Sequence, residues 1–179
     1  MDQWVALLRG INVGGNNLVP MVALRTLCAG LGWADVESYI ASGNLVFRAE
    51  GDAEGLAIAL RQAMTAQMGC DVPIIVWPGA AMHAALADCP FDPQAGSHVH
   101  GFFLWAEPWV DQVALAQFRA PSETLIVRGR VAWLHAPDGI GRSKLAEKFD
   151  KVVTGTQMTG RNLNTLRKLV EMLDASDAG

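Results

Sequence analysis

Two short runs in the first quarter of the chain contain side chains that could bind an anion. The donors of the first run, directly after the apolar stretch of residues 4–8, are Arg9, Asn12, Asn16 and Asn17. The polar residues of the second run are Ser42 and Asn44. Arginine and asparagine donate hydrogen bonds, and the interspersed glycines let backbone N–H groups come close to a ligand. The alternative is that the asparagines only occupy left-handed turn positions.

Another set of donors lies in the last third of the chain. In the run from Gly139 to Leu145, Ser143 is predicted to cap a helix that Arg142 and Lys144 flank, where free N–H groups and the helix dipole favour an anion. Residues 159–162 predict a similar helix entry, at which Arg161 could contact a phosphate bidentately and Asn162 begins the last helix. The spacings GxxxxGK[ST] and GxGxxG are absent. A tight structural turn and a surface arginine are the alternatives.

Metal and cofactor chemistry is not indicated by the sequence. His98 and His100 would share one face of a strand, but no third ligand stands at a recognisable spacing. We therefore expect no metal and no cofactor. No GxSxG motif or other nucleophile arrangement is present, so whether the protein is an enzyme stays open. A transferase or hydrolase acting on a phosphorylated small molecule would need a general base that the sequence does not identify.

Composition indicates a core-forming globular protein, with 51% hydrophobic and 18% charged residues. No signal peptide or membrane span is recognisable, and the three cysteines are far apart, so we expect a cytoplasmic protein without a membrane partner. The segment 128–168 has nine Lys or Arg and three Asp or Glu, although the whole chain carries −4. A nucleic-acid partner for this basic segment is therefore one alternative, and a solvated basic face is another.

Hydrophobic periodicity predicts the elements that must position these residues. In the first half they are a strand ending at residue 8, a helix over 21–31, strands over 36–40 and 45–47, a helix over 53–68 and a strand over 72–77. This β-α-β-β-α-β order is that of a ferredoxin-like unit. The loop after its first strand and the turn between its second and third strands lie at the same end. We therefore expect Arg9, Asn12, Asn16 and Asn17 to lie near Ser42 and Asn44.

The second half predicts β-α-β-β-α again, with residues 78–98 and 150–160 as linkers and a last helix over 162–173. The expected fold class is thus α+β, with two ferredoxin-like halves packed as one compact unit and no obvious sequence repeat between them. The expected subdomains are residues 1–78 and 79–179, the second of which carries the basic helices.

Four blocks of the sequence carry a resemblance to a known family. They are Arg9 to Gly15 with Val19-Pro20-Met21, Ser42 to Phe47, Gly139 to Leu145, and Thr159 to Asn162. In this order they resemble the bacterial family called "domain of unknown function 1697". The resemblance implies a cytoplasmic α+β protein with no assigned activity. Where such proteins often carry lysine, this chain has Asn16 and Leu18.

Binding of a small anionic ligand, phosphorylated by preference, is the leading functional hypothesis from the sequence. The donors would come from the Arg9–Asn17 loop with Ser42 and Asn44, or from the Arg142–Lys144 helix start with Arg161. A structural protein without a ligand is the third hypothesis, and it is favoured if both asparagine-rich turns satisfy their own hydrogen bonds. The sequence does not indicate an oligomeric state.

Overall fold

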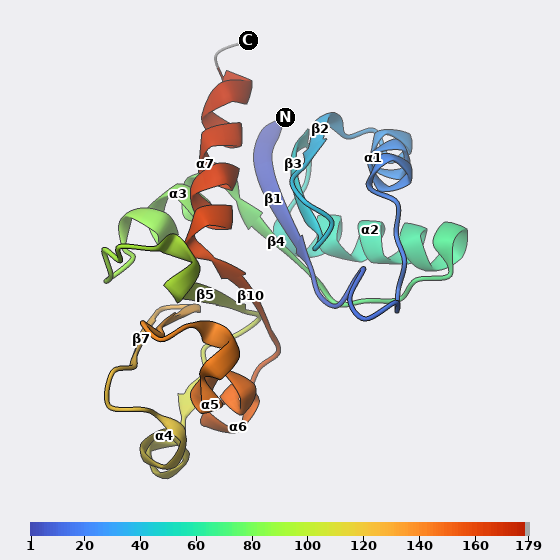
Figure 1. Ribbon diagram of the computed structural model, residues 1–179. Helices are drawn as coiled ribbons and strands as arrows, with labels where there is room; N and C mark the ends of the chain where they lie inside the picture. The colour runs from blue at the N-terminus through green and yellow to red at the C-terminus, as the bar shows by residue number, and fades with distance from the viewer. Residues whose placement is uncertain (178–179) are drawn as a thin grey trace. The chain divides into compact units, whose positions relative to one another are not determined.

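The structure is a computed structural model that describes residues 1–177 (Figure 1). Its contacts divide the chain into two compact units. The first consists of Met1–Leu86 with Arg167–Gly179, and the second of Ala87–Leu166. This grouping differs from the expected boundary at residue 78, because one helix after that residue and most of the last helix belong with the first unit.

The first unit contains the predicted ferredoxin-like order. Its elements are β1 (Asp2–Leu8), α1 (Met21–Gly30), β2 (Ala34–Ser38), β3 (Asn44–Ala49), α2 (Ala53–Met68) and β4 (Ile74–Pro78). The four strands form one antiparallel sheet in the order β2-β3-β1-β4. In the central pairs, Trp4 lies opposite Phe47 of β3 and Pro78 of β4. The prediction of a split β-α-β-β-α-β unit is confirmed.

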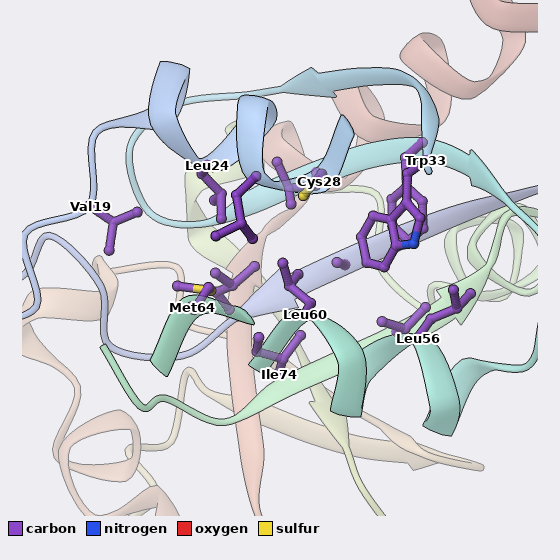
Figure 2. Packing of buried hydrophobic residues seen from close by; sticks show 14 of the residues in the cluster. Val19, Leu24, Cys28, Trp33, Leu56, Leu60, Met64 and Ile74 are labelled. Atoms are coloured by element: carbon purple, nitrogen blue, oxygen red, sulfur yellow. The ribbon is translucent and has the colours of Figure 1, made fainter. Parts of the chain in front are cut away.

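The main core of the first unit lies between one face of this sheet and helices α1 and α2 (Figure 2). Alternate residues of β1 point to that face, namely Trp4, Ala6 and Leu8. The helices contribute residues at helical spacing, among them Leu24, Cys28, Leu56, Leu60 and Met64. Both ends of helix α2 are capped. The Asp52 side chain accepts a hydrogen bond from Gly55 N–H at the N-terminus, and Gly69 adopts the left-handed conformation at the C-terminus.

Two further helices belong to the first unit, α3 (Gly79–Ala87) and the C-terminal part of α7 (Leu163–Asp177). The Gln3 amide donates to Leu173 O at 2.8 Å, and the Arg48 guanidinium donates to Ser176 O at 3.0 Å. Gln3 and Arg48 are register partners in β1 and β3, and Gln3 alternates with Trp4. Helix α7 is therefore tied to the side of the sheet that α1 and α2 leave uncovered.

The second unit repeats the strand order of the first. Its strands and helices are β5 (Val99–Leu104), β6 (Trp109–Val110), α4 (Gln112–Phe118), β7 (Thr124–Arg128), β8 (Val131–His135), α5 (Lys144–Glu147), α6 (Phe149–Val152), β9 (Val153–Thr154) and β10 (Met158–Asn162). The sheet order β10-β5-β8-β7 corresponds to β4-β1-β3-β2 of the first unit. The predicted structural duplication is thus present, and the fold class is α+β with two halves.

Strand β10, with α6 and β9 before it, corrects the prediction that residues 150–160 are a linker, and residues 159–162 form a strand that leads directly into α7. The strand pairs with β5, and Gly160 lies opposite Phe102. A Cβ atom on Gly160 would lie 2.8 Å from the Phe102 ring, so the glycine makes room for that ring. Phe102 also stacks on Phe149 of α6 at a centroid distance of 3.9 Å. A strand with glycine at its centre has a weak local signal and forms here through this tertiary packing.

The cysteines of the described chain are unbridged. Burial raises the pKa of the Cys28 thiol to about 12, and burial together with Asp71 raises the pKa of Cys70. Since only the thiolate is nucleophilic, we expect Ellman's reagent at pH 8 to modify the half-exposed Cys89 first and Cys28 only after unfolding. Stopped-flow absorbance with Cys89→Ser as the control checks this, and rapid modification of Cys28 in native protein would contradict it.

Among the described residues, no helix has the length and apolar character needed to cross a membrane. Within the same part of the chain, no group of three or more His, Cys, Asp or Glu side chains is arranged to hold a metal ion.

Candidate functional site

The loop after β1 and the turn before β3 meet in the first unit, as the topology predicts. The Asn12 amide donates to Ala41 O at 2.7 Å and to Val19 O at 3.0 Å, and its Oδ1 accepts from Val19 N at 2.7 Å. Leu8 N–H donates to Gly43 O at 2.9 Å. Asn12 has a left-handed backbone, with φ +52°. This side chain therefore closes its own loop and fastens it to the neighbouring turn.

The other amides in this region also bond within the protein. Asn17 Nδ2 donates to Gly10 O at 3.0 Å, while the fully buried Asn44 donates to Tyr39 O and to the Ser42 hydroxyl. Such bonds to backbone carbonyls are what a turn-forming role requires. Asn12, Asn17 and Asn44 thus bond to the protein's own backbone, which meets the condition of the structural hypothesis for these three asparagines but not for Asn16.

Arg9 and Asn16 are exposed, as Asn17 also is, and they differ from the three asparagines above in their side-chain contacts. Within residues 1–177, neither side chain has a recorded hydrogen-bond or ion-pair partner. Next to the same turn, Ile40 has φ +48° and is 52% exposed. A β-branched residue in the left-handed region is strained. The end of the first unit therefore presents Arg9 and Asn16 to solvent on a loop that hydrogen bonds fix.

The predicted donors Arg142, Ser143 and Lys144 line a hollow in the second unit with a volume of about 370 Å³. The remaining lining residues are Ile140, Gly141, Ala146 and Glu147. The Ser143 hydroxyl accepts from Ala146 N–H at 3.0 Å, so the predicted cap is formed. The helix that it caps, α5, has only four residues. A helix of one turn has a small dipole, so the side-chain charges, and not the helix, must attract an anion here.

Positive charge dominates around this hollow. Its one lining carboxylate, Glu147, accepts from Lys148 Nζ at 2.6 Å. That contact, with the charges of Lys144 and Lys151, holds the pKa of Glu147 below its usual range. Arg142 and Lys144 are exposed, and no acidic partner within 4 Å is recorded for either in the described part of the chain. The hollow thus has two cations available to a ligand.

Arg161 lies apart from this hollow. It belongs to β10 and pairs with Gly101, whose neighbours are Trp133 and Leu166. Adjacent strand residues point to opposite faces, and Phe102 packs against α6, so Arg161 lies on the face away from α5 and α6. Its guanidinium donates to the Thr159 hydroxyl and to Gly160 O, each at 2.8 Å. Burial lowers its pKa to about 10. The two predicted groups of donors in the second half do not form one site.

Asn162 is the last residue of β10 and also stands at the start of the last helix, since α7 begins at Leu163. Its Oδ1 accepts from Thr165 N–H at 2.9 Å and so caps α7. The Asn162 side chain thus has a structural role as a helix cap, as Ser143 has in α5.

Burial lowers the pKa of His100. Its Nδ1 atom is buried without a hydrogen-bond partner among the described residues. The unfolded chain therefore binds a proton more readily than the folded one, and the free energy of unfolding should fall as the pH drops below about 6.5. We expect His100→Phe to flatten this decline, measured by urea unfolding between pH 8 and pH 5. An unchanged pH slope in the variant would contradict the assignment.

Several exposed residues in the second unit were not identified from the sequence. Trp109 is 67% exposed and Val113 is 80% exposed. Lys148 and Lys151 follow Lys144 at helical spacing. The spacing of the lysines was readable, but six dispersed tryptophans gave no signal that one of them would face solvent.

The fold and this geometry define a class: an α+β protein of two ferredoxin-like units, one of which has a basic hollow. The chain belongs to the family described as "Protein of unknown function (DUF1697)", whose model matches residues 1–133. The matched range includes the loop after β1 and the turn before β3. It ends before residues 140–147, which contain the lining of the hollow.

A solved structure with a similar fold is that of conserved bacterial protein SP0830 from Streptococcus pneumoniae. It is 26% identical to this chain, with a TM-score of 0.70, and the alignment covers 96% of this chain and 98% of that one. The comparison with curated proteins gave no match.

Proposed function

We propose that this protein binds a small phosphorylated ligand in the hollow beside Arg142 and Lys144. The observation that carries the proposal is the charge of the hollow, where two exposed cations face about 370 Å³ of space and Lys148 already engages the single lining carboxylate, Glu147. Arginine and lysine together provide a planar fork and a point charge for phosphate oxygens. The loop after β1 is not included, because the amides of Asn12 and Asn17 are engaged with the backbone.

Ligand binding would be measured by thermal shift with inorganic phosphate, sugar phosphates, nucleotides and, for comparison, organic acids. A ligand at 100 times its dissociation constant stabilises the folded state by about 2.7 kcal/mol. At roughly 2–4 °C per kcal/mol, this gives a shift of about 5–10 °C. We expect Arg142→Ala and Lys144→Ala to reduce the shift and the double variant to abolish it.

Two further variants make the test specific for charge in the hollow. Glu147→Gln removes the lining carboxylate and should tighten binding. Arg167→Ala removes an exposed arginine of the same basic segment outside the hollow, and should leave binding unchanged. A shift that survives the Arg142→Ala, Lys144→Ala double variant, or no shift with any compound, would overturn the proposal.

We also propose that the protein is located in the cytoplasm of a bacterial cell. The three unbridged cysteines support it, because a reducing compartment keeps thiols free. Cell fractionation with an antibody against the native chain tests this, and recovery with secreted or envelope proteins would count against it.

A further inference from the structure

A line of lysines begins at the hollow and follows the outer side of α5 and α6. Lys144 begins α5, Lys148 lies between α5 and α6, and Lys151 belongs to α6, so the three lysines fall within eight consecutive residues. The opposite side of the same segment is buried through Leu145, Phe149 and Val152. We call Arg142 and these three lysines the basic stripe. Two carboxylates lie among them, Glu147 and Asp150, so the stripe keeps a net charge of +2.

The far end of the basic stripe adjoins an exposed aromatic ring. Asp111 N–H donates to Val152 O at 2.8 Å, and Trp109 of β6 pairs with Thr154 of β9, directly after α6. The Trp109 side chain is 67% exposed. Arg142 lines the hollow, and Val152, ten positions later in the chain, accepts from Asp111 close to Trp109, so the stripe begins at the hollow and ends near that ring.

We propose that the basic stripe binds a short single-stranded nucleic acid, with one phosphate in the hollow and one base stacked on Trp109. This inference rests on the proposed phosphate site and names its ligand class. Proteins that bind single strands combine cations along the backbone with aromatic rings on which bases stack. The stripe has four cations within the ten residues 142–151 and ends next to such a ring.

The distribution of carboxylates favours a strand over an anionic membrane. Glu147 and Asp150 lie within the stripe, and Glu107 and Asp111 flank Trp109. A flat bilayer surface would face all four carboxylates within a Debye length and be repelled by them. A flexible strand can place its phosphates at the cations and its sugars and bases elsewhere.

The experiment is fluorescence anisotropy of labelled dodecathymidylate and dodecauridylate, titrated with the full chain over a series of salt concentrations. With three to four phosphates neutralised, log K should fall with log salt at a slope of about −2 to −3. Trp109→Ala should weaken binding by about 10-fold, whereas Trp109→Phe should retain most of it. Lys151→Ala should reduce the slope by about 0.7.

The controls separate the named outcomes. Val113→Ala trims the neighbouring apolar side chain, 80% exposed, and should not change oligonucleotide affinity. One outcome is that inorganic phosphate binds in the hollow, oligonucleotides bind no more tightly than phosphate, and Trp109→Ala does not change oligonucleotide affinity. This outcome overturns the inference and leaves the proposed function standing. If neither phosphate nor oligonucleotide binds, both are overturned. A third outcome is that the protein does not bind oligonucleotides but binds vesicles of equal parts phosphatidylglycerol and phosphatidylcholine, and that Trp109→Ala and Val113→Ala each abolish vesicle binding. This outcome overturns the inference in favour of a membrane.

Discussion

Gly43→Ala will lower the free energy of unfolding by about 3 kcal/mol, a shift in Tm of roughly 6–12 °C. Gly43 has φ +94°, and a Cβ atom at this position would lie 2.7 Å from Leu8 Cβ and 3.1 Å from Ile11 side-chain atoms. The left-handed backbone alone costs a residue with a side chain about 1–2 kcal/mol. The contact adds to this because both neighbours are fully buried and cannot move aside.

The matched control for this substitution is Gly15→Ala. Gly15 lies in the adjoining loop with φ +77°, but nothing lies within 4 Å of its Cβ position. Urea unfolding of both variants should show about 1 kcal/mol for Gly15→Ala, so the difference between them measures the crowding at Gly43. Equal losses in the two variants would show that the turn before β3 relaxes around the added methyl group.

Asn12→Asp will destabilise the protein by about 2–3 kcal/mol, although it retains the side-chain shape and the tolerance for φ +52°. The amide donates to two carbonyl oxygens, those of Val19 and Ala41. A carboxylate has no hydrogen to donate and would place negative charge against both oxygens. The loss should diminish at low pH, where the new carboxyl group is protonated and can donate again.

Asn16→Asp is the control for Asn12→Asp. It makes the same chemical change in the same loop, at an exposed side chain with no recorded partner within residues 1–177. Urea unfolding at pH 7 should give wild-type stability for Asn16→Asp. A loss in Asn12→Asp that is equally small would mean that the bonds of Asn12 contribute little, and the loop would then be available for a ligand.

The first unit was predictable from the sequence because its helices and strands have the apolar periodicity of their class and clear end signals. Asp52 and Gly69 mark the two ends of α2, and both functions are observed. In the second unit β10 was not predictable, because Gly160 and Arg161 lie at its centre. The strand is specified by its pairing with β5 and by the fit of the Phe102 ring against Gly160, which are contacts between residues far apart in sequence.

The candidate site was predictable in part. Topology alone indicated that the loop of Asn12 approaches the turn of Ser42 and Gly43, and this is confirmed. The sequence did not reveal which groups accept hydrogen bonds from Asn12. They are backbone carbonyls, and because every residue has a backbone carbonyl, no residue type marks such a partner in the sequence. For Arg142 and Lys144 the sequence located the charges, but the hollow depends on how the chain folds around a helix of only four residues.

The division of the first unit between two segments of the chain has a consequence for biosynthesis. Residues 1–86 leave the ribosome early, but Arg167 and the residues after it follow only when the whole second unit, about 80 residues, has been made. At about 5–20 residues per second, this interval is on the order of 4–16 s. During that time Gln3 and Arg48 lack the carbonyl groups of α7 that they bond in the finished protein. The sheet of the first unit is therefore made before the second unit, but the helix that its Gln3 and Arg48 side chains contact is made after it.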